Sequence, residues 1–165
     1  MEIRKTRLTD ISAALEIYAA ARKFMAEKGN PDQWTDGYPS EDFIKEDILN
    51  GNSYVITDKD DNIFGIFTFI IGKDPTYAVI ENGDWLNEKP YGVIHRIAST
   101  GQLKGITDIC LDWCFQQIDN IRIDTHQDNE PMKQTLIRNG FKYCGIIFCH
   151  NGTERIAFQK YIGKK

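Results

Sequence analysis

The spacing of apolar residues changes several times along this chain, and the order of the changes is what most constrains its fold. Alternating patterns predict strands and three-to-four-residue spacings predict helices. In chain order we expect a strand at 3–7, helices at 10–28 and 41–49, strands at 53–57, 63–71 and 91–99, a helix at 106–118, a strand at 120–125, a helix at 129–139, and strands at 141–149 and 153–161. Helices between strands imply some parallel pairing through right-handed crossovers. The order predicts one mixed α/β domain over residues 1–165.

Composition narrows the class of protein. The chain is 41% hydrophobic, which is enough for a real core, and its 20 Lys and Arg against 24 Asp and Glu give a formal charge of −4. The chain therefore lacks the excess of positive charge that favours non-specific nucleic-acid binding, although a local basic patch is still possible. No apolar run approaches the ~20 residues of a membrane span, and MEIRKTRLTD lacks the apolar core of a signal peptide. The four cysteines form no CxxC pair, and we expect them to be free thiols. We expect the protein to be cytoplasmic and to bind neither nucleic acid nor a membrane.

The segment 99–107 carries the most informative chemistry, since it joins an expected strand to an expected helix. Its residues are Ser-Thr-Gly-Gln-Leu-Lys-Gly-Ile-Thr, and the glycines at 101 and 105 allow a tight turn and a close approach to a ligand. The helix starts just after Gly105, so unpaired N–H groups of its first turn favour an anion such as phosphate. Lys104 adds a positive charge and Thr107 a hydroxyl. Taken alone, such glycines are more often ordinary turn residues than a phosphate cradle.

Two motifs give this segment a context. Residues 102–107, Gln-Leu-Lys-Gly-Ile-Thr, resemble the Q/R-x-x-G-x-G/A signature with which the GCN5-related N-acetyltransferase (GNAT) superfamily binds the pyrophosphate of acetyl-coenzyme A (acetyl-CoA). The preceding Ile94–Ser99 is similar to the family's R-L-A-V strand, and Asn129 with Gly140-Phe141 resembles its N-x-x-A…G-F motif. The order of elements also resembles this fold over nearly the whole chain. The resemblance implies a twisted, mostly antiparallel sheet of six to seven strands flanked by about four helices.

The resemblance also implies a reaction and a set of binding residues. Acetyl-CoA would be the co-substrate, without a metal, and the acetyl group would pass directly to a primary amine of a small molecule, amino acid or peptide. The pantetheine arm would pair like an extra strand with the backbone of Ile97, Ala98 and Ser99. The pyrophosphate would be held by the amides of Gln102, Leu103, Lys104, Gly105, Ile106 and Thr107. Asn129 would contact the cofactor from the next helix, although it suits an N-cap equally well and can do both. A homodimer is one option for the assembly.

Two positions depart from the family pattern. Thr107 stands where the family prefers Gly or Ala, and its hydroxyl could bond a phosphate. Leu136 stands seven residues after Asn129, where the family often places a Tyr that protonates the departing thiolate. The missing acid leaves open a second hypothesis, a non-catalytic or regulatory module that kept the CoA site. A nucleotide-binding protein is disfavoured because the chain contains no GxxxxGK[ST] sequence and no acid follows the loop in the dinucleotide pattern.

His95 is the first candidate for a general base, because an alkyl ammonium must lose a proton before it can attack. Strand alternation places it on the same face as Val93 and Ile97, beside the position where the family keeps its base. Glu81, in the irregular segment 73–90, is the second candidate. A structural role stays open for both, as a strand histidine satisfied by its neighbours and as an exposed loop carboxylate.

Large aromatic residues in loops are candidates for binding the acceptor. For each of them, pocket lining and local loop packing are equally good interpretations. These residues are Trp34, Tyr38, Tyr77 and Trp85, with the carboxylates Glu81, Asp84 and Glu88 near the last two in sequence. Aromatic walls with carboxylates would suit a cationic or amino-acid-like amine. Other polar candidates are given structural roles: His126 a loop hydrogen bond, Cys110 and Cys114 core packing, and Tyr143 an outward position on its strand.

Overall fold

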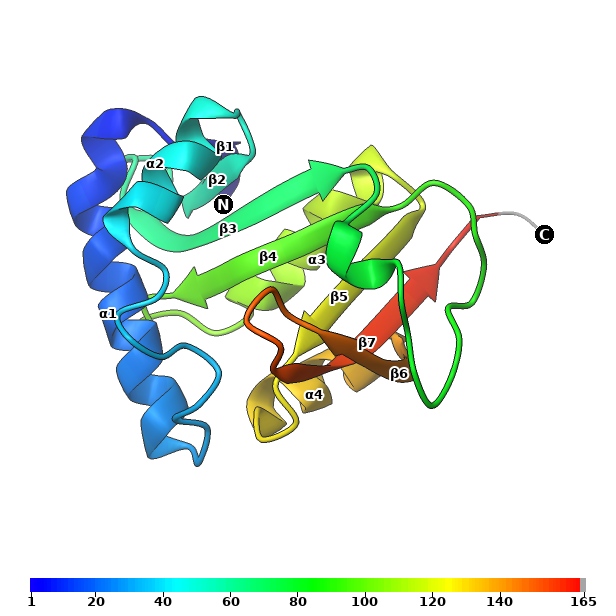
Figure 1. Cartoon of the computed structure of the whole chain (residues 1–165). Helices are drawn as coiled ribbons and strands as arrows, with labels where there is room; N and C mark the ends of the chain where they lie inside the picture. Colours follow the sequence, from blue (N-terminus) through cyan, green and yellow to red (C-terminus); the bar gives the residue numbers. More distant parts are fainter. Residues whose placement is uncertain (164–165) are drawn as a thin grey trace.

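A computed structural model describes residues 1–163, so the last two residues of the expected domain lie outside the described part. The strands are β1 (Glu2–Lys5), β2 (Ser53–Thr57), β3 (Ile63–Ile71), β4 (Gly92–Ser99), β5 (Asn120–Thr125), β6 (Lys142–Phe148) and β7 (Glu154–Tyr161). The helices are α1 (Ile11–Glu27), α2 (Glu41–Leu49), α3 (Ile106–Gln117) and α4 (Glu130–Arg138), with short 3-10 helices at Leu8–Asp10 and Pro75–Tyr77 (Figure 1). Each expected strand and helix is present, with ends within a few residues of the sequence prediction.

The seven strands form one sheet in the order β1-β2-β3-β4-β5-β7-β6. All neighbouring strands are antiparallel except β4 and β5, which are parallel and are connected through α3. Helices cover both faces of the sheet, and α3 and α4 lie behind it in Figure 1. The expected fold, a mixed and mostly antiparallel sheet with four flanking helices, is confirmed.

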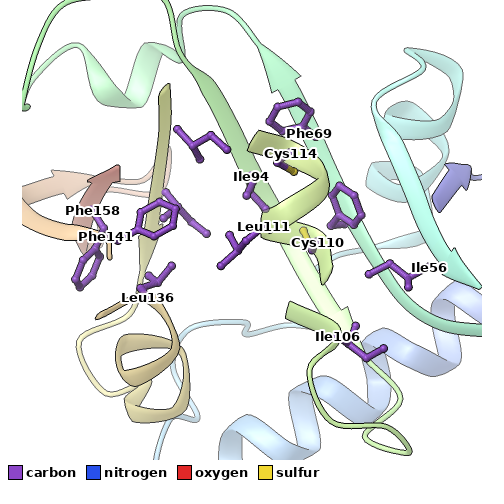
Figure 2. Close-up of a cluster of buried hydrophobic side chains, with 13 residues drawn as sticks. Ile56, Phe69, Ile94, Ile106, Cys110, Leu111, Cys114, Leu136, Phe141 and Phe158 are labelled. Carbon is purple, nitrogen blue, oxygen red and sulfur yellow. The ribbon is translucent and has the colours of Figure 1, made fainter. Parts of the chain in front are cut away.

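Both faces of the sheet bury apolar clusters, because consecutive strand residues point in opposite directions. Val55 packs with α1 and α2, whereas Ile56 packs with α3 and α4. Figure 2 shows the cluster under α3, where Cys110 and Leu111 face the strands and Leu136 of α4 closes one side. Cys110 and Cys114 are 0% exposed, so their expected role in core packing is confirmed.

The cluster under α3 should dominate the stability of the domain. Leu111 is 2% exposed, and Leu111→Ala is expected to lower the free energy of unfolding by about 2–5 kcal/mol, because the truncation leaves a cavity. Leu49→Ala is the matched control, since Leu49 is 73% exposed, and it should change stability by about 0.5 kcal/mol or less. Denaturant unfolding measures both. Equal losses in the two variants would contradict this assignment of the core.

Short-range signals explain where most helices begin. The Ser40 hydroxyl accepts a hydrogen bond from the Phe43 amide at 3.3 Å and caps α2. Helix α1 begins differently: Thr9 or Asp10 would be the expected cap from sequence, but the Asp10 side chain does not cap α1. It accepts instead from the Arg7 amide at 2.7 Å, because a 3-10 turn precedes the helix. None of the helices formed by residues 1–163 combines the length and apolar character needed to cross a bilayer.

Strand β4 contains two irregularities that shape the rest of the molecule. Its pairing with β5 ends at Val93, whereas its pairing with β3 continues to Ser99, so β4 and β5 diverge toward their carboxyl ends (Figure 1). A β-bulge sets Arg96 and Ile97 opposite Phe67, with Arg96 in the left-handed region at a φ of 50°. An extra residue in one strand breaks its alternation.

The bulge corrects one expectation about β4. Ile97 packs against the cluster under α3, together with Ile94, whereas Val93 belongs to a cluster on the other face of the sheet. His95 and Ile97 therefore do not share a face, as simple alternation would require.

Candidate functional site

A cavity of about 740 Å³ opens where β4 and β5 diverge. Its walls come from the loop before α2, from α2, from the segment after β3, from β4 and β5, and from the turn between β6 and β7. His95, Arg96 and Ile97 of β4 lie on one side, and Asp124 of β5 on the other. The two strands no longer hydrogen-bond to each other here, and residues of both line the cavity.

His95 faces this cavity and has a carboxylate partner that the sequence did not reveal. Its Nε2 lies 2.7 Å from the Asp74 Oδ2. Asp74 is itself fixed, since its Oδ1 accepts from the amide and hydroxyl of Thr76, at 2.8 and 2.7 Å, and its amide donates to the Tyr91 hydroxyl at 3.0 Å. Burial raises the pKa of Asp74, but hydrogen bonds from His95 and Thr76 outweigh it and lower the pKa to about 2. Asp74 is therefore an ionised partner that orients the imidazole.

The lowered pKa of Asp74 makes stability depend on pH. A carboxyl group whose pKa is depressed on folding, here from 3.8 to about 2, stabilises the protein above pH 3.8 and loses that contribution as the pH falls toward 2. The free energy of unfolding should fall in this window, and Asp74→Asn should weaken the fall. Urea unfolding at a series of acidic pH values measures this, and an identical slope in the variant would show that other groups cause it.

The bulge in β4 is held by residues from far away in the chain. The Arg96 side chain makes two hydrogen bonds to Asp47 of α2, at 2.8 and 2.7 Å, and a third to the Tyr38 hydroxyl at 2.9 Å. The Arg96 carbonyl accepts from the Tyr18 hydroxyl of α1 at 2.8 Å. The strained backbone at Arg96 thus coincides with its anchoring to both α1 and α2, and this tie was not predicted.

The edge of β4 that faces β5 and the helix that follows offer free backbone groups. Beyond Val93 no described strand pairs with that edge, so the expected pantetheine residues Ile97, Ala98 and Ser99 lie on an open edge. The N-cap of α3 is Gly105, with a φ of 82° and no side-chain cap. A Cβ at Gly105 would meet nothing within 4 Å. An exposed, uncapped helix start of this kind fits a diphosphate.

The other residues expected to hold the diphosphate lie around Gly105. Gln102, Leu103 and Lys104 are exposed, Ile106 is buried in the core and Thr107 is half-buried. Their backbone amides form the first turn of α3 and the bend before it. Because the cradle is a backbone feature, the burial of the Ile106 side chain does not conflict with it.

Asn129 caps α4, and a residue the sequence left unassigned completes its contacts. The Asn129 Oδ1 accepts from the Met132 amide at 3.2 Å, and its Nδ2 donates to the Gln33 Oε1 at 2.8 Å. The Gln33 Oε1 also accepts from Asn30 at 2.8 Å and Thr125 at 3.4 Å. Asn129 therefore acts as the expected N-cap and ties α4 to the loop before α2, while its cofactor contact stays a prediction.

The aromatic candidates divide into two groups. Trp34 and Tyr38 line the cavity in an edge-to-face contact, with centroids 6.3 Å apart. Tyr77 and Trp85 do not line it: Tyr77 is 2% exposed, and Trp85 stacks on the Arg122 guanidinium at 4.2 Å and donates to the Tyr77 carbonyl at 3.0 Å. Of the two interpretations, local loop packing rather than pocket lining therefore applies to Tyr77 and Trp85.

Glu81 also lies away from the cavity. It is exposed, and its backbone pairs with Ile146 of β6 in an isolated bridge, at 2.9 and 2.8 Å. The bridge holds the segment between β3 and β4 against β6, so the carboxylate is displaced from His95's cavity. Asp84 and Glu88 are exposed as well and do not line the cavity.

The remaining candidates have the structural roles expected of them. Leu136 is 0% exposed within the core, so this position offers no proton donor. Tyr143 points outward at 54% exposure, and the His126 Nδ1 accepts from the Asp128 amide at 3.0 Å. Within residues 1–163, no group of three or more His, Cys, Asp or Glu is placed to hold a metal ion.

Solved structures resemble this fold over nearly the whole chain, although no family model and no curated protein matches the sequence. A GNAT family acetyltransferase from Streptococcus agalactiae is 31% identical, with a TM-score of 0.89 over 99% of this chain and 96% of its own. One from Listeria monocytogenes is 18% identical, with a TM-score of 0.72 over 98% and 94%. The ribosomal-protein-S18-alanine N-acetyltransferase of Escherichia coli is 13% identical, with a TM-score of 0.64 over 99% and 95%. The last two likenesses show the fold alone.

The streptococcal likeness extends from sequence to structure. It covers 99% of this chain and so spans the described sheet. A shared fold with 31% identity over nearly the full length indicates common descent. This chain therefore belongs to the GNAT family of acetyltransferases.

Proposed function

We propose that this protein transfers an acetyl group from acetyl-CoA to a primary amine of a small molecule, an amino acid or a peptide. The observation that carries the proposal is the open edge of β4, which leads from the cavity to the uncapped start of α3. Extended amides suit a strand edge, and a diphosphate suits a helix N-terminus. Bound acetyl-CoA supplies the acetyl group as an activated thioester.

His95 is the proposed general base in this mechanism. With Nε2–H donated to Asp74, Nδ1 is the nitrogen free to accept a proton from the ammonium of the acceptor. The ionised Asp74 then stabilises the imidazolium that forms. The neutral amine can attack once that proton has left.

The proton for the departing thiolate needs another source than the family's usual tyrosine. Leu136 is buried and apolar at that position, so solvent or another group in the cavity must serve. The same observation favours the second candidate function, a regulatory module that binds CoA without turnover.

Release of the CoA thiol separates the two functions. The measurement is steady-state thiol production from acetyl-CoA with a panel of primary amines, beside calorimetry with CoA, ATP and NAD. Acceptor-dependent thiol release and selective CoA binding are expected. Binding of CoA with no release from any amine would support the regulatory module, and selective binding of ATP or NAD would contradict both.

A further inference from the structure

Two arginines line the cavity, and among residues 1–163 only Arg96 has a carboxylate partner. Arg155 of β7 is 7% exposed and donates to three neutral oxygens: the carbonyls of Gln33 and Glu154, both at 2.9 Å, and the Thr153 hydroxyl at 3.2 Å. Within residues 1–163, no carboxylate oxygen lies within 4.0 Å of its guanidinium. A guanidinium has five N–H donors, so two remain for another partner.

A buried guanidinium without a counter-ion is unusual, because burial of an unpaired charge is costly. Arg155 also borders a smaller hollow of about 260 Å³, where Asp32 and Glu154 are the nearby acidic residues. Both are exposed and neither forms an ion pair with it among the described residues. An anion that enters the main cavity would supply the missing partner.

Asp124 is the opposite case, a carboxylate without a cation. Its Oδ1 accepts from the Tyr77 hydroxyl at 2.6 Å, and within the described part of the chain it forms no ion pair. The last parallel pair is Val93 with Arg122, so His95 and Asp124 each lie two residues beyond it on their own strand, and both line the cavity. An ammonium between these two would meet both a counter-charge and the proposed base.

Cys149 shows that these charges act on one region of the cavity. Cys149 also lines the cavity. Burial raises the pKa of Cys149, the charge of Arg155 opposes the rise, and the charges of Asp124 and Asp74 add to it. Asp74, Asp124 and Arg155 line the same cavity as Cys149, so a small molecule bound there meets charges of both signs.

We infer that the acceptor is a zwitterion, a free amino acid whose ammonium faces Asp124 and His95 and whose carboxylate faces Arg155. This inference rests on the proposed function and narrows its acceptor from any primary amine. A purely cationic amine would leave the Arg155 guanidinium unpaired. An amine that also carries a carboxylate satisfies both unpartnered charges at once.

The test compares free amino acids with their own carboxamides. Each pair shares the amine and the side chain and differs in the carboxylate, so binding to the CoA-saturated protein isolates the contribution of that group. Calorimetry should show at least one free amino acid binding about tenfold or more tighter than its amide, as a charge-assisted hydrogen bond would give. Arg155→Gln should remove the difference, and Arg155→Lys should retain part of it.

A second variant checks the other end of the ligand. Asp124→Asn should weaken the binding of the amino acid and of its amide by similar factors, because both carry the ammonium. The comparison within wild-type protein decides the matter even where Arg155→Gln does not fold. Equal affinities of acid and amide, equal losses of both in Arg155→Gln, or no binding by any pair would overturn the inference.

The outcomes keep the two proposals apart. Thiol release with amines regardless of a carboxylate would retain the transferase and reject the zwitterion. Carboxylate-dependent binding without thiol release from any amine would reject the transferase and retain the amino-acid site.

Discussion

Gly105→Glu is expected to abolish CoA binding, with the affinity falling at least about 100-fold. Gly105 is the N-cap of α3, and a Cβ added to it would have no neighbouring atom within 4 Å. A glutamate here would place a negative charge beside the proposed diphosphate site, where it would repel the diphosphate and compete for the helix amides. Calorimetry with CoA measures the loss.

Gly29→Glu is the matched control for backbone strain. Gly29 follows α1 with a φ of 84°, against 82° for Gly105, and its Cβ would also meet nothing within 4 Å. Both variants impose a similar strain on the backbone, but only one lies at the start of α3. We expect Gly29→Glu to keep its CoA affinity. Normal affinity in a folded Gly105→Glu protein would remove the diphosphate assignment.

Local signals made the fold predictable. Asn129 and Gly140 mark the two ends of α4, Gly105 marks the start of α3, and Asn151-Gly152 joins β6 to β7. Each acts within a few residues, through a cap or a turn that only certain side chains form. The apolar spacing then identified the faces that the helices bury. Sequence therefore predicts the order of the elements and the start of α3 well.

The bulge in β4 lacked such a signal. Arg96 adopts a φ of 50°, a conformation that a glycine in the sequence would have suggested but an arginine does not. It is held there by contacts with Asp47 and Tyr18, which are 49 and 78 residues away. Asp74 lies 21 residues from His95 and meets it only because the chain returns from β3 to β4. Long-range partners of this kind follow from packing and not from spacing.

The aromatic loops show the same limit. Trp34 lines the cavity, whereas Trp85 is held away from it by Arg122, which lies between Trp85 at 4.2 Å and Tyr91 at 4.0 Å. Arg122 is on β5, far from either loop in sequence. Whether a loop aromatic lines a pocket depends on such a neighbour, so residue type alone leaves both interpretations open.

His95→Ala should lower turnover by about 10²–10⁴-fold, the range that a positioned general base contributes. Removing the imidazole takes away the one group of the His95–Asp74 pair that can accept the acceptor's proton, while the backbone cradle at α3 is untouched. CoA affinity should therefore stay close to that of the wild type. The measurements are kcat from thiol release, its pH profile, and the melting temperature.

Two further variants separate a catalytic from a structural histidine. Asp74→Asn keeps the imidazole but loses the carboxylate that stabilises its charged form, so turnover should fall less than in His95→Ala and the pH profile should change. His126→Ala is the control, because His126 accepts a loop hydrogen bond from Asp128 and lies outside the main cavity. It should leave turnover unchanged. If the rate and its pH profile survive His95→Ala in a folded protein, His95 serves the fold alone, and the base must be sought among the other groups that line the cavity.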